Sequence, residues 1–219
     1  MTSGLLDQAA AKLSELVMAY PGTQEALDSY FLKADIQEKR NRPDDAMATY
    51  VEVAERFKEN PRAAEALYKF ARLTLRSARP GKAVEARKTL GDVAKQYGKT
   101  KWAPVALLAK GELEQAQDAP AAIATYDQIA REYPKSDVHS VAVWRLAGLY
   151  EKAKSYALAA DTLSYLAKSH PLNADEAWFR AAEIYRSRLN NPAKAREAFT
   201  NIPASSRYFN DAQKDLQVG

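Results

Sequence analysis

Residues 134–171 decide the fold, and they read PKSDVHSVAVWRLAGLYEKAKSYALAADTLSYLAKSHP. In the first half, four side chains have the i, i+3, i+4 and i+7 spacing of one helical face: Val143, Leu146, Ala147 and Tyr150. The second half has a similar stripe at steps of four, three and four: Ala159, Leu163, Leu166 and His170. Neither helix can bury its own stripe, so the two must pack against each other and against neighbouring pairs. The stretch therefore predicts one unit of an array of helix pairs.

The same unit recurs along the whole chain. The small residue of the second helix repeats at separations of 37, 40, 36, 37 and 36 residues: Ala9, Ala46, Ala86, Ala122, Ala159 and Ala195. Four positions after each of these residues stands a large apolar one: Leu13, Tyr50, Leu90, Tyr126, Leu163 and Phe199. A repeat of this length is typical of helical solenoids.

The unit resembles the tetratricopeptide repeat (TPR) family. The positions of the family pattern are filled in order by Val143, Leu146-Ala147, Tyr150, Ala159, Leu163, Leu166-Ala167 and Pro171. The resemblance covers essentially all 219 residues, although the units are longer than the usual period of about 34 residues. It implies an all-α fold, a right-handed α-solenoid of five helix hairpins flanked by one helix at each end.

A narrower resemblance concerns the junctions between units. The Tyr-Pro pairs at Tyr20-Pro21 and Tyr133-Pro134 look like those of bacterial envelope TPR proteins, including outer-membrane assembly and Tol-Pal associated proteins. This likeness favours the periplasm or cell envelope over the cytoplasm without assigning a compartment. Tyr-Pro also serves as a plain helix stop, and that alternative stays open.

The array predicts a single solenoid domain over residues 1–219. We expect a lone second-type helix at 1–20, repeats at 22–58, 60–97, 99–133, 135–170 and 172–202, and a capping helix at 204–219. Outside the quoted stretch, the paired helices are expected near 24–40, 43–58, 61–77, 80–97, 101–117, 119–132, 174–189 and 192–202, and the last helix near 205–217. Because the opening helix lacks a first-helix partner, we expect a fragment of a longer array or a processed protein; a lone capping helix is the alternative.

Composition narrows the possible chemistry. The chain has no cysteine, which excludes disulfides and thiolate catalysis, and no run approaches the ~20 apolar residues of a membrane span. His170 stands in an aromatic column and is expected to pack, whereas His139 has no obvious carboxylate or nucleophile partner. No catalytic, cofactor or metal constellation can be assembled, so we expect a protein that is not an enzyme and binds no cofactor.

Charge is distributed in blocks. Residues 1–59 contain 7 Lys and Arg and 11 Asp and Glu, whereas residues 60–101 contain 11 against 3. These blocks are either solvated helix faces, a surface that captures an acidic partner, or complementary ends through which copies of the chain self-associate. Nucleic acid is not expected, because no nucleic-acid-reading motif accompanies the basic residues.

The resemblance also implies a binding surface. TPR ligands usually lie in the concave groove lined by the first helices, and the leading groove column maps onto Phe31, Tyr68, Leu108, Trp144 and Phe179. Arg72 and Arg76 lie on the same side of the basic repeat. We expect a non-enzymatic scaffold that holds a protein, peptide or helical segment between these rings, with Trp144 and Phe179 as the first anchors. The alternatives are rings that only fill space between helices and, at the level of function, a self-associating structural array.

Overall fold

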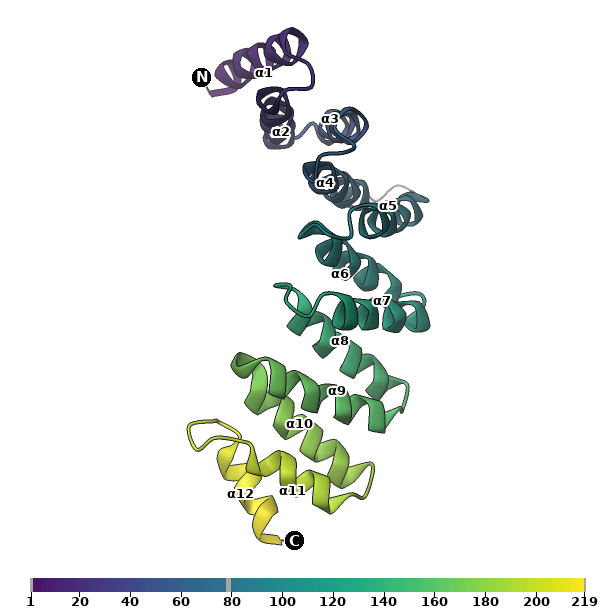
Figure 1. Cartoon of the computed structure of the whole chain (residues 1–219), viewed down its shortest axis with the longest axis vertical. Helices are drawn as coiled ribbons and strands as arrows, with labels where there is room; N and C mark the ends of the chain where they lie inside the picture. Colours follow the sequence, from purple (N-terminus) through teal and green to yellow (C-terminus); the bar gives the residue numbers. More distant parts are fainter. Residues whose placement is uncertain (1, 78–79, 219) are drawn as a thin grey trace. The chain divides into compact units, whose positions relative to one another are not determined.

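The computed structural model describes residues 2–77 and 80–218, and in this part of the chain it contains helices and no strands. The helices are α1 (Thr2–Ala19), α2 (Gln24–Lys39), α3 (Pro43–Arg56), α4 (Arg62–Arg76), α5 (Lys82–Gln96), α6 (Trp102–Gln115), α7 (Ala119–Glu132), α8 (His139–Lys152), α9 (Tyr156–Ser169), the 3-10 helix η1 (Pro171–Asn173), α10 (Ala174–Ser187), α11 (Pro192–Thr200) and α12 (Phe209–Val218). From α1 to α5 and from α7 to α12 the helices pack on their neighbours in the sequence, as Figure 1 shows, and the expected all-α hairpin fold is confirmed. None of these helices combines the length and the apolar character that crossing a membrane would require.

The chain divides into two compact units, Met1–Leu113 and Glu114–Gly219, and the boundary falls inside α6. The described residues of the N-terminal unit include an apolar cluster around Leu27, Tyr50 and Val53 and another around Leu90 and Val93. The C-terminal unit has a continuous core whose buried members come from α8 to α12 and the turn after α11. The array arrangement thus gives each unit its own interior.

The repeated small residue has a clear role in packing. Five of its six copies are at most 4 % exposed: Ala46, Ala86, Ala122, Ala159 and Ala195. An alanine at this position lets two helix backbones approach closely. Ala9 on α1 is exposed, unlike the other copies. The large apolar residue four positions later is buried in the same five repeats, so this pair of columns forms the centre of each hairpin.

Side-chain caps begin several helices. Thr23, Asp118 and Asn191 each accept a hydrogen bond from the backbone N–H three residues further on, at 3.1 Å in every case. Such a bond satisfies one of the amide groups that the first turn of a helix leaves without a partner. The start expected near residue 192 is therefore confirmed, with Pro192 in the first turn where its missing N–H does no harm.

The last helix begins later than expected. α12 starts at Phe209, whereas the sequence predicted the last helix near 205–217. The hydroxyl of Ser206 donates to Asp175 Oδ2 at 2.7 Å and accepts from the Tyr208 backbone N–H at 3.1 Å. These bonds hold the segment as a turn against α10, and a helical start at residue 205 is wrong for that reason.

Candidate partner-binding site

A pocket of about 440 Å³ opens on the first-helix side of the C-terminal unit, and we call it the Trp144 pocket. It is lined by Ser140, Val141, Trp144 and Arg145 of α8 and by Glu176 of α10. Val141 is 43 % exposed and Trp144 is half-buried, so an aliphatic and an aromatic side chain both face solvent here. These lining residues come from the first two turns of α8 and the first turn of α10, where successive first helices lie side by side.

Charged groups hold the Trp144 ring in place. The Arg180 guanidinium lies 5.3 Å from the centre of the indole ring, and its Nε is 2.7 Å from Glu151 Oε1. A cation at this distance from an indole face is attracted by the ring quadrupole. At the mouth, Glu176 pairs with Arg207 at 3.5 Å. The pocket thus combines apolar surface with charges of both signs.

Phe179, the other expected anchor, is engaged within the unit. Its ring stacks on Tyr208 with centroids 4.9 Å apart and meets Phe199 edge-on at 5.8 Å. The ring is half-buried between α10, α11 and the turn before α12. These contacts make Phe179 a packing residue that joins the last helices to the core.

The remaining predicted rings and the predicted leucine lie in the N-terminal unit. Phe31 is only 5 % exposed and is covered by the Arg62 guanidinium at 4.1 Å from its ring centre. Tyr68 is half-buried with its ring 5.2 Å from that of Trp102, and Leu108 is half-buried on α6. The Phe31 side chain is therefore enclosed by its own unit, whereas Tyr68 and Leu108 keep part of their surface exposed.

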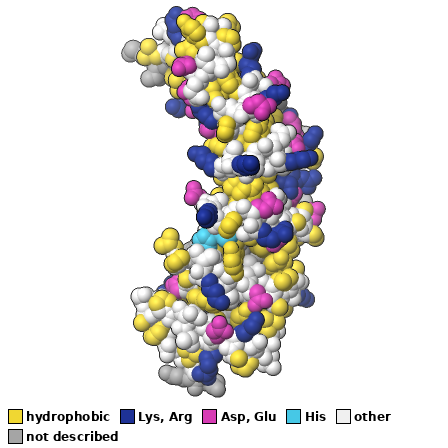
Figure 2. Space-filling view, viewed as in Figure 1, with side chains coloured by type: hydrophobic (Ala, Val, Ile, Leu, Met, Phe, Trp, Pro, Cys, Tyr) yellow, Lys and Arg dark blue, Asp and Glu magenta, His cyan; other side chains and the backbone are white. Residues whose placement is uncertain are grey.

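The two predicted arginines are exposed on α4 beside acidic residues of α2. Arg72 lies 3.7 Å from Glu38, and Arg76 lines a small cavity of about 160 Å³ together with Glu38. Two further pairs, Asp28–Arg62 and Asp35–Lys69, join the same helices. On the face shown in Figure 2, Lys and Arg side chains accordingly lie close to Asp and Glu side chains. We call the three pairs between α2 and α4 the ion-pair ladder; it links part of the acidic block to part of the basic block within one chain.

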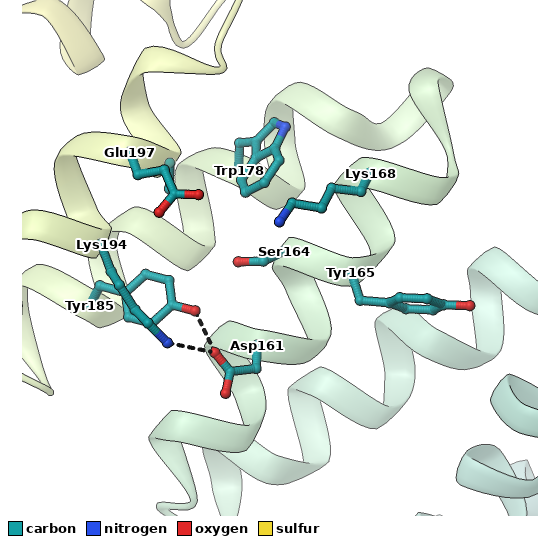
Figure 3. Close-up of a pocket in the computed structure, with 9 residues that line it drawn as sticks. Asp161, Ser164, Tyr165, Lys168, Trp178, Tyr185, Lys194 and Glu197 are labelled. Carbon is teal, nitrogen blue, oxygen red and sulfur yellow. Dashed lines mark hydrogen bonds and ion pairs between the residues drawn. The ribbon is translucent and has the colours of Figure 1, made fainter.

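A second pocket, of about 330 Å³, lies between the second helices α9 and α11 over α10 (Figure 3). Tyr185 donates to Asp161 at 2.6 Å, and Lys194 approaches the same carboxylate at 3.3 Å. The Tyr185 hydrogen bond keeps the pKa of Asp161 below its usual value, and burial raises the pKa of Tyr185. Trp178, 7 % exposed, forms part of the wall near Lys168. Because Tyr185 and Lys194 already bind the central carboxylate of Asp161, we interpret these residues mainly as contacts that hold neighbouring repeats together.

Sequence reasoning missed the pairing of the two histidines. His139 is fully buried, and its Nδ1 lies 2.6 Å from Nε2 of the half-buried His170. A usable signal was present: in the first repeat the corresponding positions, Ala26 and Phe57, are separated by the same 31 residues. The repeat register alone would have placed the two imidazoles together.

Metal ligands do not gather in the described residues: no group of three or more His, Asp and Glu side chains there could hold an ion. The Trp144 pocket and the pocket between α9 and α11 are lined by aromatic, aliphatic and charged residues.

Solved structures with a similar fold have little sequence in common with this chain. BtubC (BKLC) from P. vanneervenii aligns with a TM-score of 0.60 at 12 % identity, covering 99 % of this chain and 90 % of BtubC. YrrB, described as a TPR protein with an unusual peptide-binding site, aligns with a TM-score of 0.56 at 14 % identity, covering 94 % and 99 %. MamA from Desulfovibrio magneticus RS-1 gives 0.53 at 15 % identity, covering 88 % and 95 %. At such identities these likenesses concern the fold alone.

Sequence comparison identifies the family. No curated protein matches the chain. Residues 58–207, well over half of the chain, match the model of the tetratricopeptide repeat-like domain. The chain therefore belongs to the tetratricopeptide repeat-like family.

Proposed function

We propose that this protein is a non-enzymatic interaction scaffold that binds a peptide or helical segment of a partner protein in the Trp144 pocket. The observation that carries the proposal is the exposure of Val141 beside the half-buried indole of Trp144, in a concavity of about 440 Å³. Aromatic side chains in pockets are frequent anchors of protein interfaces. The family membership favours a protein partner, and the peptide-binding site described for YrrB favours a peptide.

The lining of the pocket favours an amphipathic segment. An apolar side chain of the partner would contact Val141 and the indole, while polar groups on its flanks would meet Arg145 and the Glu176–Arg207 pair. A place in a bacterial envelope assembly belongs to this proposal as its cellular context. Self-association through the charge blocks draws less support, because the ion-pair ladder already engages several of the same charges within one chain.

A selected peptide tests the proposal without knowledge of the natural partner. A random peptide library displayed on phage is panned on the wild-type chain at pH 7.5, and the Kd of an enriched peptide is measured by fluorescence polarisation. Trp144→Ala is expected to weaken binding by ~30-fold or more, which corresponds to loss of an anchor contributing ~2 kcal/mol. The reason is that the truncation removes the largest apolar surface of the pocket.

The matched control is Leu158→Ala, which removes a 52 % exposed side chain from α9, outside the lining of the pocket. Its Kd should stay within about threefold of wild type, since it touches nothing the peptide is proposed to contact. Wild-type affinity in Trp144→Ala, or a library that yields no specific peptide, would refute the assignment. Circular dichroism of both variants confirms that the helices are intact.

A further inference from the structure

The two histidines of the chain form an imidazole pair at the start of α8. His139 Nδ1 lies 2.6 Å from His170 Nε2, and the ring centres are 4.9 Å apart. The other nitrogen of His139, Nε2, lies 3.2 Å from the carbonyl oxygen of Ala130 on α7. His139 is 0 % exposed, so its hydrogen bonds must be satisfied within the protein.

These contacts fix the protons of the neutral pair. A carbonyl oxygen only accepts, so His139 Nε2 carries a proton and donates it to Ala130. His139 Nδ1 is then an acceptor, and His170 Nε2–H must donate to it. The pair therefore contains one proton between the two facing nitrogens, and both imidazoles are in the Nε2–H form.

One additional proton is tolerated by this geometry, but a second is not. A proton on the half-buried His170 can be placed on its Nδ1 without disturbing the short contact. A proton on His139 must go to Nδ1, where it would face the His170 Nε2–H at 2.6 Å. Two donors and two positive charges cannot share that distance in a buried site, so double protonation requires the rings to separate.

The surroundings provide no anion to stabilise a charged His139. From α9, the ionisable groups that face it are His170 and Tyr165, whose hydroxyl is 3.5 Å from Nε2 and whose ring meets it edge-on. From α7 it meets the Ala130 carbonyl, and the adjacent side chains of Arg131 and Glu132 are exposed. Within the described part of the chain, no Asp or Glu forms a hydrogen bond or ion pair with either imidazole. His139 is also the first residue of α8, where the helix dipole disfavours a positive charge.

One member of the pair, His139, directly precedes residues that line the Trp144 pocket. Ser140, Val141 and Trp144, which line the Trp144 pocket, follow His139 in the first two turns of α8. We propose that the His139–His170 pair is an acid-sensitive latch: it holds the start of α8 while neutral or singly protonated, and double protonation releases this turn and disassembles the Trp144 pocket. The effect on binding rests on the function proposed for that pocket.

The direction of the pH dependence follows from linkage. Burial lowers the pKa of His139 from its ordinary value of 6.5; the Ala130 hydrogen bond opposes this with a smaller effect, and the nearby His170 adds the smallest effect, which again lowers the pKa. When the two rings are separated, the pair binds more protons than it does when they are in contact. Closure is therefore fully favoured above pH 6.5 and is progressively lost as the pH falls from 6.5 to the lowered pKa of His139.

Other repeats provide a matched variant. At the positions of His139 and His170, the first three repeats have a fully buried alanine and an aromatic residue: Ala26 with Phe57, Ala63 with Tyr97, and Ala103 with Tyr133. The double variant His139→Ala, His170→Tyr restores this pairing with a similar total volume. It should fold, keep the pocket residues unchanged, and lack the titrating pair.

Hydrogen exchange tests the latch without a ligand. Amide protection in α8 is measured by mass spectrometry at pH 7.5, 6.5 and 5.5, with intrinsic exchange rates corrected for pH. In the wild type, protection of the first turns of α8 should fall by up to about tenfold per pH unit below 6.5 for each proton taken up on opening. In the double variant it should not change with pH. Equal pH dependence in both proteins would overturn the latch.

Two further measurements distinguish failure of the latch from failure of the function proposed for the Trp144 pocket. Nitrogen-15 NMR of labelled histidines in the wild type at pH 7.5 should show both rings in the Nε2–H form; an Nδ1–H His139 would overturn the latch even if the variant failed to fold. The affinity of a selected peptide without His, Asp or Glu should fall at pH 5.5 in the wild type only. Unchanged affinity despite loss of protection would overturn the link to the pocket, and no binding at pH 7.5 would refute the proposed function while leaving the latch intact.

Discussion

Tyr30 shows how one buried hydroxyl makes stability depend on pH. The residue is 2 % exposed, and its hydroxyl donates to Glu52 Oε1 at 2.7 Å. Burial, together with this carboxylate, raises the pKa of Tyr30 to about 12. In the unfolded chain a tyrosine ionises near pH ~10, so the unfolded state loses a proton that the folded state keeps. The contribution of Tyr30 is therefore complete below pH ~10 and is lost as the pH rises to about 12.

Tyr30→Phe should weaken this alkaline dependence. Between pH ~10 and 12 the free energy of unfolding of the variant should fall less steeply than that of the wild type, by at most roughly 1.4 kcal/mol per pH unit. Urea unfolding at pH 8, 10 and 11 measures the difference. Tyr20→Phe, at a 63 % exposed position, is the control and should retain the wild-type slope. A wild-type slope in Tyr30→Phe would contradict the raised pKa.

Single residues also show where sequence reasoning succeeds. The repeated small and large apolar columns were predictable because a position that is buried in one hairpin is buried in its copies, as Ala122 and Ala159 both are. Phe31 was harder, since its burial depends on Arg62 of the next repeat covering its ring. Such a contact follows from three-dimensional placement and leaves no period in the sequence.

At the scale of elements, helix identity was predictable and some ends were not. The range 119–132 expected for α7 matches the structure, because Asp118 caps its start and the apolar spacing defines its extent. α12 begins at Phe209 because a hydrogen bond from Ser206 to Asp175, 31 residues away, ties down the preceding turn. A local pattern predicts local caps, whereas a distant side chain can end or delay a helix without any local sign.

The ion-pair ladder makes a prediction for two neighbouring elements. Asp35 of α2 lies 3.1 Å from Lys69 of α4, with side chains 45 % and 19 % exposed. The ammonium also lies 5.4 Å from the ring centre of Phe31. In a double-mutant cycle, Asp35→Ala and Lys69→Ala should show a coupling of ~0.2–1 kcal/mol in the free energy of unfolding. This range is typical of partly exposed pairs.

Salt separates the electrostatic part of this coupling from packing. In about 0.5 M NaCl, the Asp35–Lys69 coupling should decrease, because the screening length approaches the contact distance. Lys69→Ala alone should still cost stability, since the Lys69 side chain is only 19 % exposed and its truncation removes buried aliphatic surface. A cycle with zero coupling at low salt would show that the ladder does not stabilise the contact of α2 with α4.

At the scale of the whole molecule, the repeat design distributes the core along the chain. Every buried member of the main C-terminal cluster lies between Val143 and Ala212, and those of the two N-terminal clusters lie between Ala26 and Ala106. When elements contact mainly their neighbours in the sequence, stability becomes a sum of local terms, as in other solenoids. A destabilising substitution in one hairpin should then lower stability mainly within its own unit.

Two matched core variants test this distribution. Leu90 in the N-terminal unit and Leu163 in the C-terminal unit occupy the same repeat column and are 1 % and 0 % exposed. Replacing either leucine with alanine leaves a cavity and should cost ~2–5 kcal/mol in the hairpin concerned. Native-state hydrogen exchange should then rise chiefly in α4 and α5 for Leu90→Ala, and chiefly in α8 to α10 for Leu163→Ala. If both variants instead accelerated exchange equally in all helices, the protein would unfold as one cooperative body, and the Trp144 pocket could not loosen independently of the N-terminal unit.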